Sequence, residues 1–217
     1  MKISEEYSVR KIFSKEAYPF LLKIHYAKRI PNITNSFGLF FENKMVGVVT
    51  FGLPPSPSLQ VQFGNDFNFV ELNRLCLLKQ FKRNVLSYFV SKSLNLLPKN
   101  SVIVSYSDID YNHSGYIYQA TNWVYTGIGS VGVKRFVMKD GSERHSRHKH
   151  LIKEWEVDEV LLSVGKHRYF YFVGDKRSKR LFMKKLEHYY EILDYPKDKN
   201  ELYEIKSEGF DIQKTLF

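Results

Sequence analysis

Two adjacent apolar runs, residues 36–41 and 44–53, meet at the polar turn residues Glu42-Asn43-Lys44. Short apolar runs joined by such a turn predict a β-hairpin. Other runs of strand length recur along the chain, rich in apolar, β-branched and aromatic residues. They predict further strands at residues 3–12, 68–78, 101–108, 123–129, 131–141 and 166–173.

Apolar residues at helical spacing predict four helices between these strands. The first covers residues 18–29, because Pro19 fits only in the first turn of a helix and Pro31 ends it. The others cover residues 82–99, 113–122 and 176–190. The proline-rich segment 54–58 predicts a stiff loop that cannot join a sheet. This order of elements indicates a mixed α/β domain whose sheet is flanked by helices.

The 217-residue chain is 43% hydrophobic, which is enough to bury one substantial core. Its apolar runs are far shorter than the roughly 20 residues that span a membrane, and residues 1–11 lack the apolar segment of a secretory signal. Cys76 is the single cysteine, which excludes an internal disulfide and a cysteine-rich zinc site; we expect it to be a small buried hydrophobe. These features predict a cytoplasmic protein and leave its oligomeric state undefined.

Basic residues give the chain a net charge of +10 and are concentrated in its C-terminal half. Residues 134–149 hold six Lys and Arg against two acids, residues 166–185 hold eight against one, and residues 191–217 hold four against seven. Clustered cations suit a polyphosphate partner, because neutralised phosphates release counterions; a surface that only maintains solubility is the alternative. We expect phosphate contacts from Arg144, Arg147, Lys149, Lys176, Arg177, Lys179 and Arg180.

Several short motifs within residues 20–130 occur in the order found in one known family. They are His25-Tyr26, GVVTFG (47–52) with Pro54-Pro55, ELNRL (71–75), RNVLS (83–87), SYSD (105–108) and GYIYQATNWVYTG (115–127). Together they resemble the Mom family of phage DNA-modification proteins, which has a fold like that of the Gcn5-related (GNAT) N-acyltransferases. We therefore expect a mostly antiparallel split sheet flanked by helices, with residues 1–140 as the catalytic core and residues 141–217 as a basic extension packed on it.

The resemblance also implies an activity. It implies conversion of the exocyclic amine of adenine, in double-stranded DNA, to a methylcarbamoyl derivative that blocks restriction enzymes. An acetyl-coenzyme A-like donor and iron are the cofactors that it implies. Because the adenine amine lies inside the duplex, we expect the base to be flipped out against an aromatic wall.

Asp108 and Tyr118 are the main catalytic candidates. Asp108 ends a buried strand, where an open α/β sheet presents side chains to its crevice; it is a candidate general base or metal ligand. Asp110 competes for that role, and capping of the following turn is the structural alternative. Tyr118 takes the family's tyrosine position, with Asn122-Trp123 in place of its Gly-Phe, and its phenol can protonate a leaving thiolate. We prefer Tyr118 to Tyr116, which lies on another helical face. We expect the side-chain oxygens of Asp108 and Tyr118 to converge on one cleft.

Arg74 interrupts an apolar strand, where alternation places it on one face with Leu72 and Cys76. A buried guanidinium needs a partner, so Arg74 either forms a structural ion pair or clamps a phosphate or Asp108. The start of the helix near residue 84 is the second anion site. Arg83, Asn84 and Ser87 are candidates to bind coenzyme A pyrophosphate there, without the usual glycine-rich turn; helix capping is the alternative.

His25 and Tyr26 match the family's pair, and we expect them to line the pocket from the first helix. A satisfied core histidine is the alternative for His25. With Asp108 and a tyrosine oxygen, His25 would give iron a nitrogen and oxygen ligand set. The tract 144–150 we interpret as a phosphate-seeking loop rather than a metal site. Two competing hypotheses are an ordinary coenzyme A-dependent N-acyltransferase acting on a small amine or a protein, and a non-catalytic DNA-binding module.

Overall fold

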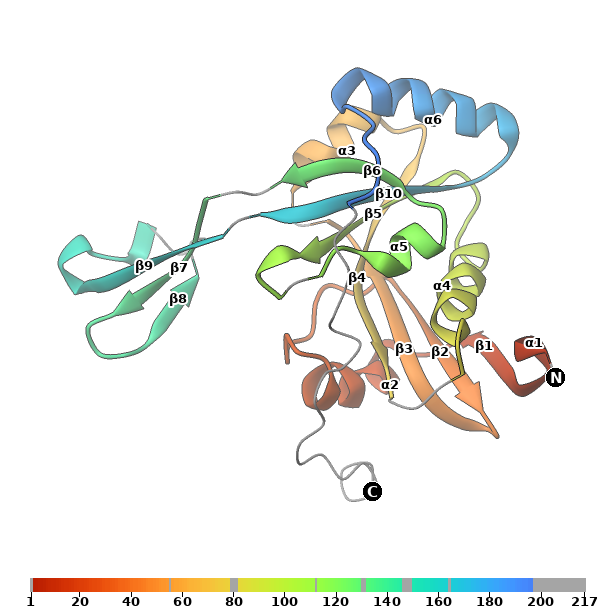
Figure 1. Cartoon of the computed structure of the whole chain (residues 1–217), viewed down its shortest axis with the longest axis horizontal. Helices are drawn as coiled ribbons and strands as arrows, with labels where there is room; N and C mark the ends of the chain where they lie inside the picture. The colour runs from red at the N-terminus through yellow and green to blue at the C-terminus, as the bar shows by residue number, and fades with distance from the viewer. Residues whose placement is uncertain are drawn as a thin grey trace.

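The computed structural model describes residues 2–54, 56–78, 82–111, 113–129, 132–145, 150–163 and 165–196. One seven-stranded sheet forms the centre of the molecule (Figure 1). Its strands lie in the order β1 (Tyr7–Lys11), β2 (Asn35–Phe41), β3 (Lys44–Gly52), β4 (Asn68–Leu77), β5 (Ser101–Asp108), β10 (Lys166–Val173) and β6 (Val124–Gly129). Neighbouring strands are antiparallel except β4 and β5. The predicted fold class, a mixed α/β fold with a largely antiparallel sheet, is confirmed.

The sheet is split between its two parallel strands. β4 and β5 pair only over residues 68–71 and 101–104, although both strands continue, to Leu77 and Asp108. Beyond this short ladder the strands separate at their carboxyl ends. The split is therefore a property of the backbone and does not depend on any one side chain.

Helices cover both faces of the sheet (Figure 1). One face, called the α4 face below, packs against α4 (Val85–Asn95) and α5 (Tyr116–Ala120) in the core that contains Phe89 and Tyr118. The opposite face, called the α6 face, is covered by α2 (Ser14–Pro19), α3 (Pro57–Phe63) and α6 (Lys176–Tyr189). Alternation along β4 assigns these layers, because Val70 joins the first core and Phe69 the second.

A bulge at Asn73 changes the faces that β4 presents. Thr50 pairs with Arg74 while the next residue, Phe51, pairs with Leu72, so Asn73 is the extra residue. Its amide is held at both ends, accepting from Thr50 Oγ1 at 2.6 Å and donating to the Asn32 carbonyl at 2.8 Å. Leu72 consequently packs on the α4 face and Cys76 on the α6 face. The prediction that Leu72, Arg74 and Cys76 share one face was wrong for Leu72.

Three further strands form an arm that extends away from the core (Figure 1). They form a separate sheet in the order β8 (Glu143–His145), β7 (Gly132–Met138) and β9 (Val157–Ser163). β10 follows the arm and lies between β5 and β6 in the main sheet. The expected boundary at residue 140 therefore differs from the observed division, since the segment after it supplies both a central strand and α6.

The N-terminal region differs from the expected elements in three places. Helix α1 (Ile3–Glu6) precedes β1, and α3 begins at Pro57, whose fixed φ suits the first position of a helix. The first long helix begins at Ser14 and continues beyond Pro19 only as a π-helical turn, η1 (Phe20–Ile24). It ends because His25 adopts an extended backbone. His25 and Tyr26 thus follow this helix instead of lying within it, contrary to expectation.

The other expected elements are present, including the hairpin of β2 and β3 and the helices α4, α5 and α6. Short 3₁₀ turns, η2 (Ile109–Tyr111) and η4 (Glu154–Glu156), complete the described elements. Cys76 is buried, as expected, and desolvation raises the pKa of its thiol to about 12. Within the described residues, no helix combines the length and apolar character needed to cross a membrane.

Candidate functional site

A group of polar and aromatic residues lies near the split, where β4 and β5 separate. We call it the polar cluster; its members come from the segment after η1, from β4, from the end of β5 and the turn that follows it, and from β10. They are His25, Tyr26, Arg74, Asp108, Tyr111, His113 and Lys166. The carboxyl ends of strands at a topological irregularity are where α/β sheets bind ligands. The split and the cluster together define the candidate site.

Asp108 is the buried acid of the cluster. Only 5% of the residue is exposed, and its Oδ2 lies 3.0 Å from Nζ of Lys166, its cross-strand partner on β10. The Asp108 main-chain carbonyl accepts a hydrogen bond from the His113 amide at 3.1 Å, which holds the following turn against the strand end. Asp108 is therefore fixed from both its side chain and its backbone.

His25 is neutral in the folded protein. Burial, followed by the positive charge of Arg74 and by His113, lowers its pKa to about 4. Its Nδ1 accepts a hydrogen bond from the Ala27 amide at 3.0 Å, so in the neutral ring the proton is on Nε2. His25 can thus donate one hydrogen bond from Nε2 at neutral pH.

Tyr26 and Tyr111 form the aromatic surface of the cluster. The Tyr26 ring stacks on His25 with centroids 4.4 Å apart and contacts the Tyr111 ring at 4.8 Å. Tyr26 is 50% exposed and Tyr111 is 40% exposed, so both rings are accessible from solvent. Desolvation, and then the negative charge of Asp108, raises the pKa of Tyr26. The Tyr26 hydroxyl therefore keeps its proton at neutral pH.

Arg74 presents an unsatisfied donor. Its Nε is buried and has no hydrogen-bond partner among the described residues, while its Nη1 donates to the Asn73 carbonyl at 2.5 Å. Desolvation, and then the neighbouring charge of Arg29, lowers its pKa. Leaving a buried donor without a hydrogen bond costs about 1–3 kcal/mol. The folded protein therefore retains Arg74 at an energetic penalty. Such a donor is suited to an incoming oxygen.

Tyr118 lies on the other side of the sheet. It is 7% exposed and its hydroxyl lies 2.7 Å from Ser105 Oγ, which is also 2.8 Å from the Leu72 carbonyl. Ser105 and Asp108 are three residues apart in one strand and so leave it on opposite faces. The expectation that Asp108 and Tyr118 converge on one cleft was wrong. Burial raises the pKa of Tyr118, which keeps this phenol protonated.

The N-terminus of α4 has features of an anion site. Asn84 occupies the position before the helix with φ +69°, a left-handed conformation that glycine would otherwise supply, and it makes no side-chain cap. Ser87 donates to the Asn84 carbonyl at 3.0 Å, and Arg83 is exposed. Ser87 thus supports the first turn of the helix, and the binding of a pyrophosphate by Arg83 and Asn84 stays a prediction.

The expected iron ligands do not fit a metal. His25 uses Nδ1 to accept from Ala27 and carries its proton on Nε2, so neither ring nitrogen offers a free lone pair. Asp108 is held by Lys166. No group of three or more His, Cys, Asp or Glu side chains that would hold a metal occurs in the described part of the chain. The Asp110 side chain lies outside the described residues.

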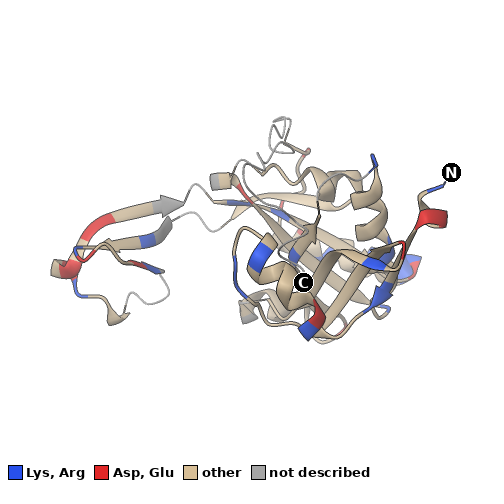
Figure 2. Ribbon diagram, turned by 90° about the horizontal axis from the view of Figure 1, so that it is seen from below, with Lys and Arg blue, Asp and Glu red and all other residues tan. Residues whose placement is uncertain are grey.

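The expected phosphate contacts fall in different places. Lys176, Arg177, Lys179 and Arg180 lie in the first half of α6 and are exposed. Arg144 lies on β8 of the arm, whereas Arg147 and Lys149 fall outside the described residues. The arm also carries many acidic residues (Figure 2), namely Asp140, Glu143, Glu154, Glu156, Asp158 and Glu159.

Sequence reasoning missed three members of the cluster. Lys166 joins the cluster because β10 pairs with β5. This pairing brings together segments nearly 60 residues apart, and no local sequence pattern predicts it. Tyr111 and His113 flank the turn after β5 and were not singled out. Their position directly after the acid that ends a buried strand is a signal that was available in SYSDIDYNH.

The family model described as the Mom protein family matches residues 6–197. The chain belongs to the Mom protein family. Methylcarbamoylase mom of Escherichia phage Mu is 28% identical over 214 residues, an alignment that covers 89% of this chain and 85% of that relative.

Solved structures of acetyltransferases also match. An acetyltransferase from Bacillus subtilis in complex with CoA is 12% identical, with a TM-score of 0.43, and the match covers 77% of this chain and 98% of the other. A GNAT family acetyltransferase from Elizabethkingia anophelis with acetyl-CoA bound is 10% identical, with a TM-score of 0.43, and covers 78% and 99%.

Proposed function

We propose that this member of the Mom family transfers a methylcarbamoyl group to the exocyclic amine of adenine in double-stranded DNA. Membership of the family and the name of the phage Mu relative support a transferase of this kind. The observation that carries the proposal is the polar cluster beside the split. It brings together a buried carboxylate, a guanidinium whose Nε has no partner among the described residues, and two exposed aromatic rings. Such a reaction takes place in the cytoplasm of the cell that holds the phage DNA, and its product resists restriction enzymes.

The α6 face would receive the acceptor. An extruded base stacks on aromatic side chains, and Tyr26 and Tyr111 offer exposed rings for this purpose. Asp108, buried beside them, accepts the proton that the exocyclic amine loses as its nitrogen forms the new bond. The free Nε of Arg74 then bonds the carbonyl oxygen of the transferred group, where negative charge develops.

The α4 face would receive the donor, a coenzyme A-class thioester that already carries the methylcarbamoyl group (CH₃–NH–CO–S), because an acetyl thioester would leave an acetyl group on the amine. Arg83 and the uncapped first turn of α4 would hold its phosphates. The bond from the carbonyl carbon to sulfur breaks as the bond to nitrogen forms, and the thiolate takes a proton from Tyr118. The acceptor would approach from the α6 face and the donor from the α4 face, so the two would meet in the split between β4 and β5.

The proposal is tested by expressing the protein with plasmid DNA, digesting the DNA to nucleosides and measuring modified adenosine by mass spectrometry. The wild type should yield a methylcarbamoyl-adenosine, and Asp108→Asn should not. Asp194→Asn, an exposed acid that the structure places in the tail after α6, is the matched control and should behave as wild type.

Unmodified adenosine from soluble wild-type protein would overturn the proposal. Tight coenzyme A binding would in that case indicate an N-acyltransferase acting on another amine. Salt-sensitive DNA binding that persists in Asp108→Asn would instead indicate a non-catalytic DNA-binding module.

A further inference from the structure

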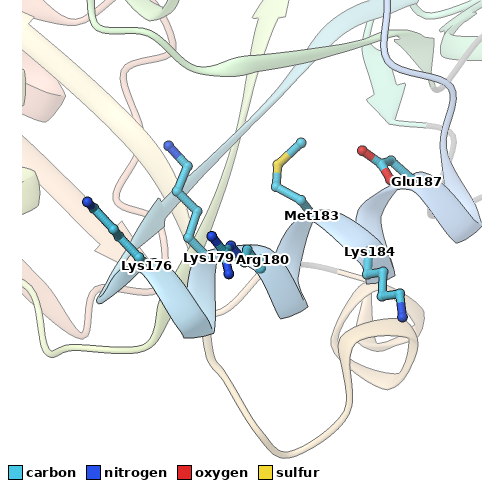
Figure 3. A pocket seen from close by; sticks show the side chains of 6 residues that line it. All are labelled: Lys176, Lys179, Arg180, Met183, Lys184 and Glu187. Atoms are coloured by element: carbon cyan, nitrogen blue, oxygen red, sulfur yellow. The ribbon is translucent and has the colours of Figure 1, made fainter.

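Helix α6 carries a one-sided row of cations. Its buried side inserts Phe182 and Leu186 into the core of the α6 face, which fixes the helix on the sheet. The outward side presents the residues of Figure 3, which line a shallow hollow of about 380 Å³. We call the four cations among them the α6 stripe: Lys176, Lys179, Arg180 and Lys184.

The spacing of the α6 stripe suits a regular anion. Residues three, four and eight apart lie along one side of a helix, and the four side chains span about 12 Å at 1.5 Å per residue. That length corresponds to the axial rise of about three to four nucleotides along one strand of duplex DNA. Among the described residues, Glu187 is the single acid that lines the hollow. The arm is less suitable for binding such an anion, because its described residues include both basic and acidic side chains (Figure 2).

The α6 stripe lies on the same side of the sheet as the polar cluster. Alternation along β10 places Lys166 on the face that α6 covers, with Phe170 and Phe172 of the core beneath the helix. The C-terminal end of α6 leads toward the cluster, since Arg168 lies 4.1 Å from the ring centroid of Tyr190 and only two residues from Lys166. A long ligand on α6 thus runs toward Asp108.

We infer that the α6 stripe binds the phosphate backbone of duplex DNA and places one strand over the polar cluster. The inference rests on the proposed function and adds the surface that positions the substrate. Contacts of this kind give affinity and register without base readout, so their loss weakens binding to every sequence alike. If these cations only kept the surface of the helix hydrated, their removal would leave DNA binding unchanged.

The test compares three purified variants for binding to a fluorescent 20-base-pair duplex over a range of salt concentrations. The stripe variant is K176Q/K179Q/R180Q/K184Q. The matched control is K11Q/K44Q/K92Q/K99Q, which removes four exposed lysines outside α6 and the cluster. A charge-reversed pair, K176E/R180E, supplies a second version with fewer changes. Thermal melting shows whether each protein is folded.

The stripe variant should bind at least tenfold more weakly than the control. Its plot of log K against log salt should be shallower by about 3.6, which is about 0.9 for each of the four lost phosphate contacts. Equal slopes for the two variants would overturn the inference, as would preferential binding of the stripe to anionic lipid vesicles. Modified adenosine is measured separately. If the wild type modifies adenosine but the stripe variant and the control have equal salt slopes, the role of the stripe is refuted and the proposed function stands. If the stripe variant has the shallower slope but the wild type modifies no adenosine, the proposed function is refuted and the role of the stripe stands.

Discussion

Lys166 and Asp108 face each other across β10 and β5, with Nζ 3.0 Å from Oδ2. The side chain of Asp108 is 7% exposed and that of Lys166 is 41% exposed. A pair with one partner in solvent contributes about 0–1 kcal/mol to stability. Its main effect is positional, because it fixes a carboxylate beside the exposed rings of Tyr26 and Tyr111.

Asp108→Asn should abolish modification while the fold remains. An amide keeps the shape of the side chain but cannot take the proton from the adenine amine, so we expect the rate to fall by roughly 10²–10⁴-fold. Single-turnover formation of modified adenosine measures this. The melting temperature should stay close to that of the Asp194→Asn control, and a modification rate within threefold of this control would remove Asp108 from the reaction.

Tyr118→Phe tests whether the Tyr118 hydroxyl has a catalytic role or only a structural one. The change removes the hydrogen bond with Ser105 and should lower stability by about 1 kcal/mol. If the phenol protonates the leaving group, the rate should also fall by roughly 10²-fold, and this is the outcome we expect.

The matched control is Tyr169→Phe. This tyrosine is also buried on the α4 face, and its hydroxyl donates to the Ser114 carbonyl at 2.5 Å. It should lose stability and keep its rate. Equal rate effects in the two variants, measured by urea unfolding and single-turnover assays, would assign Tyr118 to packing alone.

Arg74→Met should make the protein more stable and abolish its activity. The stem of the side chain is retained while the unsatisfied Nε is removed, so the free energy of unfolding should rise by about 1 kcal/mol. Modification should be lost, because the carbonyl oxygen of the transferred group loses its donor. Urea midpoints and modified adenosine report the two quantities. A less stable protein that still modifies DNA contradicts the assigned role.

The sequence was sufficient to predict most elements and the fold class. Hairpin residues 42–44, the buried strand before Asp108 and the amphipathic pattern of α4 are local signals, and each appears in the structure as predicted. Of the expected catalytic residues, His25, Tyr26, Arg74 and Asp108 lie in the polar cluster beside the split, whereas the described residues expected to contact DNA lie on the arm and on α6.

Non-local pairing accounts for most of what sequence reasoning missed. The bulge at Asn73 depends on bonds to Thr50 and Asn32, and it reverses the alternation that placed Leu72 beside Arg74. Lys166 reaches Asp108 only because β10 inserts between β5 and β6. The convergence of Asp108 and Tyr118 failed for a simpler reason, since strand parity separates Ser105 from Asp108.

His25→Asn tests the neutral histidine through the pH dependence of stability. The pKa of His25 is lowered from 6.5 to about 4 in the folded protein, so between these values the unfolded chain binds a proton that the folded protein does not. Its contribution to stability is therefore complete above pH 6.5 and declines as pH falls toward 4, by up to about 3 kcal/mol. The asparagine Oδ1 can replace Nδ1 as the acceptor for the Ala27 amide but does not titrate. Urea unfolding from pH 7.5 to 4.5 should show a smaller acid-induced loss in the variant than in the wild type. Parallel curves would mean that folding does not lower the pKa of His25, and the assignment of a neutral His25 in the native site below pH 6.5 would then have to be abandoned.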